Sequence, residues 1–190
     1  MSFFDDNKNV GLALIIVGLI AIIAGILHPV LDDDKGAGVA YGIAGIIGGI
    51  ILLLFGLKVR SGSNDKVAIV SGLLRAIGIA TILAAIFNAI GFYLLNDSIG
   101  GAIGSLIISI IIGLIYIWIA QKIAGANKNA ISKIIWVLLV VFSIILAILS
   151  LLGAISSDIV AIISGIAWFI IYLYVFIASL SSEVKSSLGV

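Results

Sequence analysis

Long runs of apolar residues dominate the chain, and short polar stretches separate them. The runs cover residues 10–27, 37–57, 67–95, 99–120, 134–155 and 159–180. A helix needs about 20 apolar residues to cross the hydrocarbon core of a bilayer, and each run approaches or exceeds that length. The runs are too long and too uniform for the strands of a membrane barrel, and a helix satisfies its own backbone hydrogen bonds in lipid. The pattern predicts an all-α, polytopic integral membrane protein with six transmembrane helices.

Basic residues are distributed unevenly over the polar stretches. The two tails and the loops 58–66 and 122–133 hold eight Lys or Arg, whereas the other three loops hold only Lys35. Loops rich in Lys and Arg stay on the cytoplasmic side of a membrane. We therefore predict one membrane domain, residues 1–190, with both termini in the cytoplasm and the body in the plasma membrane. Its three predicted helical hairpins cover residues 10–57, 67–120 and 134–180.

The first run is predicted to be a retained helix and not a cleaved signal peptide. The tail before it carries Asp5, Asp6 and only one basic residue, Lys8, which is a poor positive region for a signal peptide. Pro29 follows the run. Because a residue before proline avoids the α region, we expect the first helix to stop at His28.

Composition narrows the class further. The chain is 63% hydrophobic and 10% charged, with a net charge of +1, whereas a soluble domain carries about 25% charged residues. These values exclude a soluble enzyme and a nucleic-acid binder, which would show a basic excess. The chain has no cysteine, so it has neither a disulfide framework nor a thiolate metal site. The excess of Ile over Leu is typical of an AT-rich prokaryote.

The third run contains one charged side chain, Arg75, and one amide side chain, Asn88. Asn88 continues a row of small residues at every fourth position, a spacing that lets a neighbouring helix approach closely. We interpret Asn88 as a partner in an interhelical hydrogen bond, with a pore or substrate ligand as the alternative. Arg75 is predicted to extend to the inner headgroups; the alternative is a buried Arg that holds an anionic substrate or a lipid phosphate.

Trp168 and His28 are the other candidate polar positions. Trp168 falls near the membrane midplane, where it is expected to pack between helices with an acceptor for its indole N–H. An aromatic-lined small-molecule cavity that includes Tyr172 is the alternative. His28 lies at the outer end of the first helix, close to Asp32–Asp34, where it is either solvated or an extracytoplasmic pH sensor.

Rows of small residues mark the predicted helix contacts. In lipid no hydrophobic force drives helices together, so close packing of small residues is a main source of association. The rows are Gly42, Gly45 and Gly49 in the second run and Gly101, Ser105, Ser109 and Gly113 in the fourth. We interpret both as helix-packing surfaces. Alternatively, one row, the second run's, forms an oligomer interface.

Two stretches near the N-terminus carry a resemblance to a known family. Residues 11–29 read GLALIIVGLIAIIAGILHP, and residues 42–56 read GIAGIIGGIILLLFG. They resemble the two halves of a repeat in HdeD-like acid-resistance membrane proteins, which have six helices in three hairpins. The resemblance covers roughly the first 57 residues, because the later hairpins lack the closing proline. It implies a small stress-related membrane protein and supplies no catalytic residues.

No catalytic, metal-binding or cofactor-binding motif occurs, so we predict that the protein is not an enzyme and needs no cofactor. The predicted function is helix packing and association within the lipid bilayer, in a stress role or as a subunit of a membrane complex. Its expected partners are a second copy or another membrane protein, and not nucleic acid. Two alternatives stay open: a passive channel or facilitator for a small neutral solute, and a lipid-binding scaffold.

Overall fold

Helices make up nearly all of the chain that the structure describes. The computed structural model describes residues 6–62, 65–126, 128–155 and 158–190. Its helices are α1 (Asn7–Leu31), α2 (Lys35–Ser61), α3 (Lys66–Asn96), α4 (Ile99–Ala124), α5 (Ala130–Gly153), α6 (Ile159–Ser179) and α7 (Ser182–Ser187). No strand occurs in the described ranges, and six of the helices are long and apolar enough to cross a membrane. The predicted all-α class and the six long apolar helices are confirmed.

Most of the long helices extend beyond the apolar runs because polar residues cap their first turns. The N-caps are Asp6, Asp34, Asp65, Ser98, Asn129 and Asp158. Each cap side chain accepts a backbone N–H; Asp34 Oδ1, for example, accepts from Ala37 N at 2.9 Å. Such a bond satisfies a donor that has no partner inside the helix. The helix starts are therefore fixed locally by the sequence.

The expected stop of α1 at His28 is wrong, because α1 continues through Pro29 in its last turn. Pro29 lacks the N–H that would bond the carbonyl of Gly25, and this carbonyl lies against the backbone of Gly42 on α2 instead. The His28 carbonyl likewise lies close to Gly38 of α2, 2.7 Å from where a Cβ atom would be. Packing of this last turn on α2 outweighs the local preference of the residue before proline.

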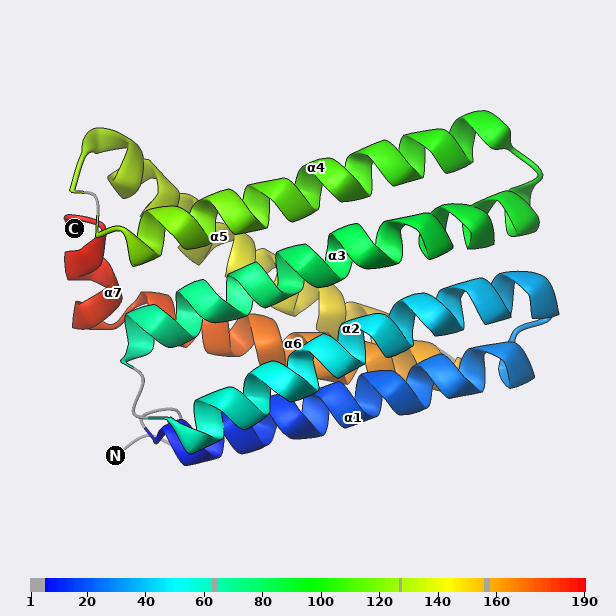
Figure 1. Ribbon diagram of the computed structural model, residues 1–190, viewed down its shortest axis with the longest axis horizontal. Coiled ribbons are helices and arrows are strands. Elements are labelled where there is room, and N and C mark those ends of the chain that lie inside the picture. Colours follow the sequence, from blue (N-terminus) through cyan, green and yellow to red (C-terminus); the bar gives the residue numbers. More distant parts are fainter. Residues whose placement is uncertain (1–5, 63–64, 127, 156–157) are drawn as a thin grey trace.

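Helices that follow one another along the chain lie side by side. The main contacts join α1 to α2, α3 to α4 and α5 to α6, and α2 also packs on α3 and α1 on α6. In Figure 1, α3 and α4 lie above α1 and α2, and α5 and α6 lie behind. α4 and α5 barely touch. α4 is also the most exposed long helix, with only Gly113, Ala120 and Ile123 buried.

Glycines set the closest approach of α1 and α2. They recur every seven residues on both helices, as Gly11, Gly18 and Gly25 on α1 and Gly42, Gly49 and Gly56 on α2. A Cβ atom on Gly18 would lie 2.6 Å from Leu53 N, and one on Gly49 would lie 2.6 Å from Gly18 O. Only a residue without a side chain fits at such distances from a backbone.

The other two helix pairs use the same device with fewer glycines. A Cβ on Gly78 of α3 would lie 2.6 Å from the carbonyl of Gly113 on α4. A Cβ on Gly165 of α6 would lie 2.6 Å from the carbonyl of Ser150 on α5. Each of the pairs α1–α2, α3–α4 and α5–α6 thus has at least one glycine that touches the partner's backbone.

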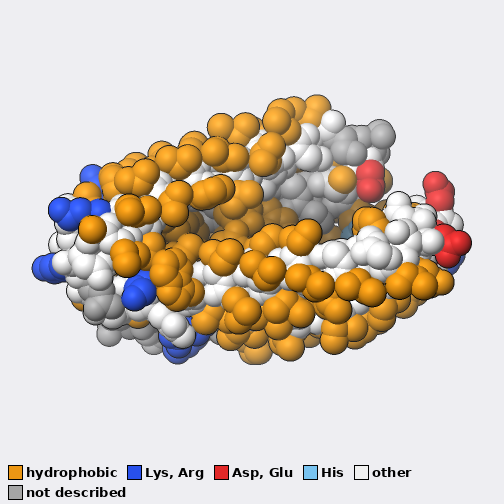
Figure 2. All heavy atoms as spheres, turned by 90° about the horizontal axis from the view of Figure 1, so that it is seen from above, with side chains coloured by type: hydrophobic (Ala, Val, Ile, Leu, Met, Phe, Trp, Pro, Cys, Tyr) orange, Lys and Arg blue, Asp and Glu red, His pale blue; other side chains and the backbone are white. Residues whose placement is uncertain are grey.

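Most Lys and Arg side chains lie at one end of the bundle, and most of the described Asp side chains lie at the other, as Figure 2 shows. We call one end acidic; its residues are Asp32, Asp33, Asp34, Asp97 and Asp158. We call the other end basic; its residues are Lys58, Arg60, Lys66, Lys122 and Lys185. The surface between the two ends is almost entirely apolar, and it is hollowed between two apolar ridges.

The apolar core fills the half of the bundle near the basic end. The short helix α7, which the apolar pattern did not predict, packs on α3, α4 and α6 at this end. Its Val184 and the following Leu188 are fully buried in the core. Trp136 Nε1 donates to the carbonyl of Ser179 at 2.9 Å, and the ammonium of Lys185 lies 5.6 Å from the centre of the Trp136 ring. The basic end of the bundle is therefore packed shut.

Candidate functional site: a polar cavity between four helices

A cavity of about 320 Å³ lies between α1, α2, α3 and α6, in the half of the bundle near the acidic end. Six polar or aromatic side chains line it: His28, Tyr41, Thr81, Asn88, Ser164 and Trp168. We call it the polar cavity. Ligand sites in proteins typically occupy about 300–1,000 Å³ and combine an apolar lining with a few polar groups. The polar cavity matches the small end of that range.

Small residues on all four helices leave this space open. They include Ala21 and Ala24 of α1, Ala44 and Gly48 of α2, Ala80 and Ala84 of α3 and Ala167 of α6. Close packing holds α1 against α2, while larger side chains such as Leu73 and Val175 fill the core nearer the basic end. Near the acidic end, the short side chains of α1, α2, α3 and α6 do not fill the space between these helices. The row that leads to Asn88 therefore faces a cavity along Ala80 and Ala84.

The floor of the polar cavity is apolar. It consists of Val17, Leu52, Ile77 and Ile171, which are at most 2% exposed and belong to the buried core. The polar cavity thus ends inside the bundle and does not continue to the basic end.

At the other side, the polar cavity adjoins a second hollow of about 530 Å³ at the acidic end, which we call the vestibule. Tyr41 lines both spaces. The carboxylates of the vestibule are Asp32, Asp33, Asp34 and Asp158. Neither lining contains Lys or Arg. Carboxylates therefore line the vestibule, and neutral groups and His28 line the polar cavity.

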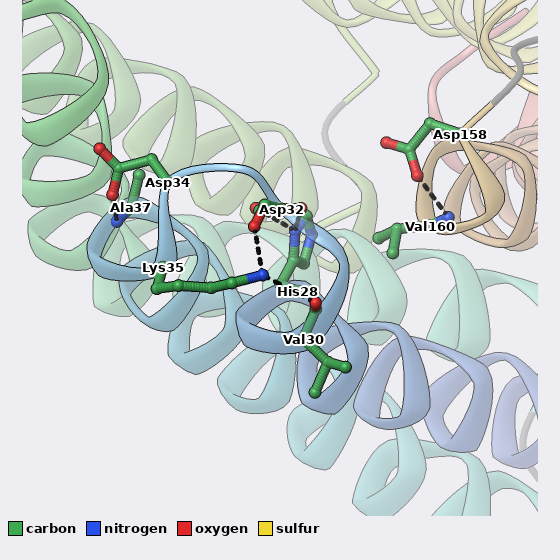
Figure 3. A network of polar contacts seen from close by, with 8 residues as sticks. All are labelled: His28, Val30, Asp32, Asp34, Lys35, Ala37, Asp158 and Val160. Atoms are coloured by element: carbon green, nitrogen blue, oxygen red, sulfur yellow. Dashed lines mark hydrogen bonds and ion pairs between the residues drawn. The ribbon is translucent and has the colours of Figure 1, made fainter.

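Most of these carboxylates also have structural roles, which Figure 3 shows. Asp34 caps α2, and Asp158 caps α6 by accepting from Val160 N at 2.8 Å. Asp32 Oδ2 lies 3.0 Å from His28 Nδ1. Lys35 Nζ donates to the backbone carbonyls of Val30 and Asp32, each at 2.8 Å. The ammonium of Lys35 is thus held on the backbone at the end of α1.

Hydrogen bonds inside the polar cavity leave acceptors available. Thr81 Oγ1 donates to the carbonyl of Ile77 at 2.9 Å, so its oxygen lone pairs can still accept. Trp168 stacks on Tyr172 with ring centres 5.6 Å apart and an angle of 22° between the rings. The rings of His28 and Tyr41 lie 6.2 Å apart. These contacts fix the aromatic side chains and leave hydroxyl and amide oxygens for a ligand.

A separate apolar groove of about 360 Å³ lies between α4, α5 and the adjoining faces of α3 and α6. Tyr116 and Tyr172 line it and are hydrogen-bonded to each other. Tyr172 therefore contacts the apolar groove on one side and Trp168, a residue of the polar cavity, on the other.

The structure brings together several of the residues singled out in the sequence. The polar cavity is lined by five residues that the sequence analysis treated as separate features: His28, Gly45, Gly49, Asn88 and Trp168. The alternative interpretation of Trp168 placed Tyr172 in the same cavity; Tyr172 stacks on Trp168 but lines the apolar groove, and a role of Trp168 in ligand binding stays a prediction. His28 contacts Asp32 at the boundary with the vestibule, and its role as a pH sensor stays a prediction.

Other candidates lie elsewhere. Arg75 is exposed on the outer face of α3, on the same face as Ile79, Leu83 and Ile86, and it lines none of the three spaces described above. This position fits a side chain that extends to headgroups. On α4, Gly113 is buried against α3 and Gly101 contacts the Phe92 ring, while Ser105 and Ser109 are half-buried.

Three polar lining residues were missed in the sequence: Tyr41, Thr81 and Ser164. Thr81 precedes Asn88 by seven residues and so shares its helix face, and this spacing could have identified it. Nothing in the sequence singles out Tyr41 or Ser164. In the part of the chain that the structure describes, no group of three or more His, Cys, Asp or Glu is placed to hold a metal ion.

Comparison of the chain with protein-family models, with curated proteins and with solved structures found no match. The resemblance of residues 11–57 to HdeD-like proteins accordingly stays a prediction from the sequence.

Proposed function

We propose that the protein binds a small solute in the polar cavity, and that the solute enters from the acidic end. The observation that carries this proposal is a cavity lined by Asn88, Thr81 and Trp168 that adjoins an open vestibule and ends at an apolar floor. This arrangement favours the channel or facilitator hypothesis over pure association. Passage to the basic end would require the floor residues to separate, so in this proposal the solute reaches the polar cavity from one end only.

The proposed orientation places the acidic end outside the cell. Three helical hairpins with both termini in the cytoplasm follow from the concentration of Lys and Arg at the basic end. A solute would then enter from the extracytoplasmic side. A stress-related role, as the family resemblance implies, is compatible with this function.

Labelling of single cysteines tests the orientation, since the natural chain has no cysteine. We expect Asp33→Cys, at the acidic end, to react with a membrane-impermeant maleimide in intact cells. Ser61→Cys, at the basic end, should react only after the membrane is permeabilised. Both positions are exposed, so access to the compartment decides the result. The reverse labelling pattern would refute the orientation.

A cysteine within the polar cavity tests solute entry. We expect Thr81→Cys to react with a small, water-soluble methanethiosulfonate reagent in the purified protein. Ala85→Cys should not react, because Ala85 is on the same helix but fully buried in packing. A Cβ on Gly48 meets no atom within 4 Å, and Gly48 lines the polar cavity. Adding Gly48→Leu should therefore fill the cavity and slow the labelling of Thr81→Cys by at least about tenfold.

Gly104→Leu is the matched control for Gly48→Leu. A Cβ on Gly104 also meets no atom within 4 Å, but Gly104 does not line the polar cavity. It should leave the labelling rate unchanged. Equal, slow reaction of Thr81→Cys and Ala85→Cys would show that solutes do not reach the cavity and would overturn the proposed function.

A further inference from the structure

We infer that the ligand of the polar cavity is a small organic cation, an alkylammonium of the size of choline, in place of the neutral solute expected from the sequence. This inference rests on the proposed function, since it names the class of solute for the same site. Three features carry it: the charge around the entrance, the aromatic lining, and the absence of Lys and Arg from both linings.

The charge of the entrance favours cations. Four Asp line the vestibule, and Lys35 directs its ammonium to the carbonyls of Val30 and Asp32. A cleft lined by charges of one sign between low-dielectric walls concentrates their field and raises the local concentration of oppositely charged solutes. An anion would be repelled there, and a neutral solute would gain nothing from the field.

The aromatic side chains suit a cation that carries alkyl groups. Trp168 and Tyr41 line the polar cavity, and tryptophan is the strongest partner for a cation over a ring face. Stacking on Tyr172 holds the Trp168 ring in place, so it is ordered before a ligand arrives. Alkyl groups of the ligand would contact the surrounding alanine and glycine residues, including Ala24 and Gly45.

The neutral groups discriminate an organic from an inorganic cation. The amide of Asn88 and the hydroxyls of Thr81 and Ser164 supply oxygen acceptors, but no carboxylate lines the polar cavity itself. A strongly hydrated metal ion would lose its water without charged ligands to replace it, at a large cost in free energy. An alkylammonium ion spreads its charge over several carbons and needs fewer such ligands.

A pair of probes of the same shape tests the inference. Choline and 3,3-dimethylbutan-1-ol differ in that a cationic nitrogen replaces a neutral carbon. We expect choline to bind the purified full-length protein at least about tenfold more tightly than the alcohol, and to slow labelling of Thr81→Cys at concentrations where the alcohol does not. Trp168→Leu should weaken choline binding by about tenfold or more. Trp118→Leu, on the exposed face of α4, is the matched control and should leave it unchanged.

The vestibule is tested separately with Asp33→Asn, because Asp33 lines the vestibule and is the N-cap of none of the described helices. We expect weaker choline binding at low ionic strength and a smaller difference from the natural protein at high ionic strength. Equal binding of the two probes, tighter binding of the alcohol, or binding of neither would overturn the inference. If Thr81→Cys still reacted faster than Ala85→Cys, the proposed function would stand; if it did not, both would fall.

Discussion

Gly49→Leu is expected to prevent stable packing of α1 on α2. Even a Cβ atom at Gly49 would lie 2.6 Å from Gly18 O and 2.8 Å from Ile22 N. These are backbone atoms of a helix, so they cannot rotate away, and α1 would have to move. Overpacking typically costs about 1–3 kcal/mol, which we expect for Gly49→Ala; the larger leucine should lower the free energy of unfolding by more than about 3 kcal/mol. Unfolding of the purified protein in detergent by a denaturant titration measures both losses.

Gly48→Ala is the control for Gly49→Ala. It lies one position along the same helix and makes the same chemical change, but its Cβ meets no atom within 4 Å. Its stability should equal or slightly exceed that of the natural protein, because alanine favours helix over glycine. Gly45→Ala should also be tolerated, since its Cβ would lie 3.4 Å from Gly25 Cα, an ordinary contact distance. Equal losses for Gly48→Ala and Gly49→Ala would contradict the close contact of α1 and α2.

Leu188→Ala is expected to lower the free energy of unfolding by about 2–5 kcal/mol. Leu188 follows α7 and is fully buried in the core that closes the basic end. Removing its branched side chain would leave a cavity in this core, where α7 packs on α3, α4 and α6. The same denaturant titration in detergent measures the loss.

Leu149→Ala makes the matched change on α5, at a leucine that is 55% exposed on the outer surface. We expect its effect to stay below about 0.5 kcal/mol. If Leu188→Ala cost no more than Leu149→Ala, the C-terminal segment would not contribute to the core, and the basic end would not be closed by α7.

The glycine rows show where sequence reasoning about packing stops. Small residues at regular spacing on α2 were predicted to form one packing surface, and Gly42, Gly45 and Gly49 were grouped together. In the structure, Gly42 and Gly49 contact the backbone of α1, whereas a Cβ on Gly45 would find ordinary space. Gly42, Gly49 and Gly56 share one face of α2 because residues seven apart return to the same face of a helix, but the same spacing also relates Gly38, which contacts α1, to Gly45, which does not contact it closely.

The polar cavity was less accessible to prediction from the sequence than the helices were. Asn88, Trp168 and His28 were recognised individually, because a polar or amphipathic side chain is conspicuous in an apolar run. Nothing in their spacing along the chain relates α1 to α3 and α6. Their convergence on one space depends on which helices are neighbours, and lipid-facing and buried faces of these helices are equally apolar.

The sequence by itself determined the number of long helices, where most of them start and the separation of charge to the two ends. These properties are local: a backbone segment in lipid must satisfy its own hydrogen bonds, and capping side chains act on the adjacent turn. Only the tertiary structure decided that α1 continues through Pro29, that α7 closes the basic end, and that small residues on α3 border a cavity. A small side chain either permits close contact with the neighbouring helix or leaves a void. The distance to that helix decides between the two, and this distance is determined by residues elsewhere in the chain.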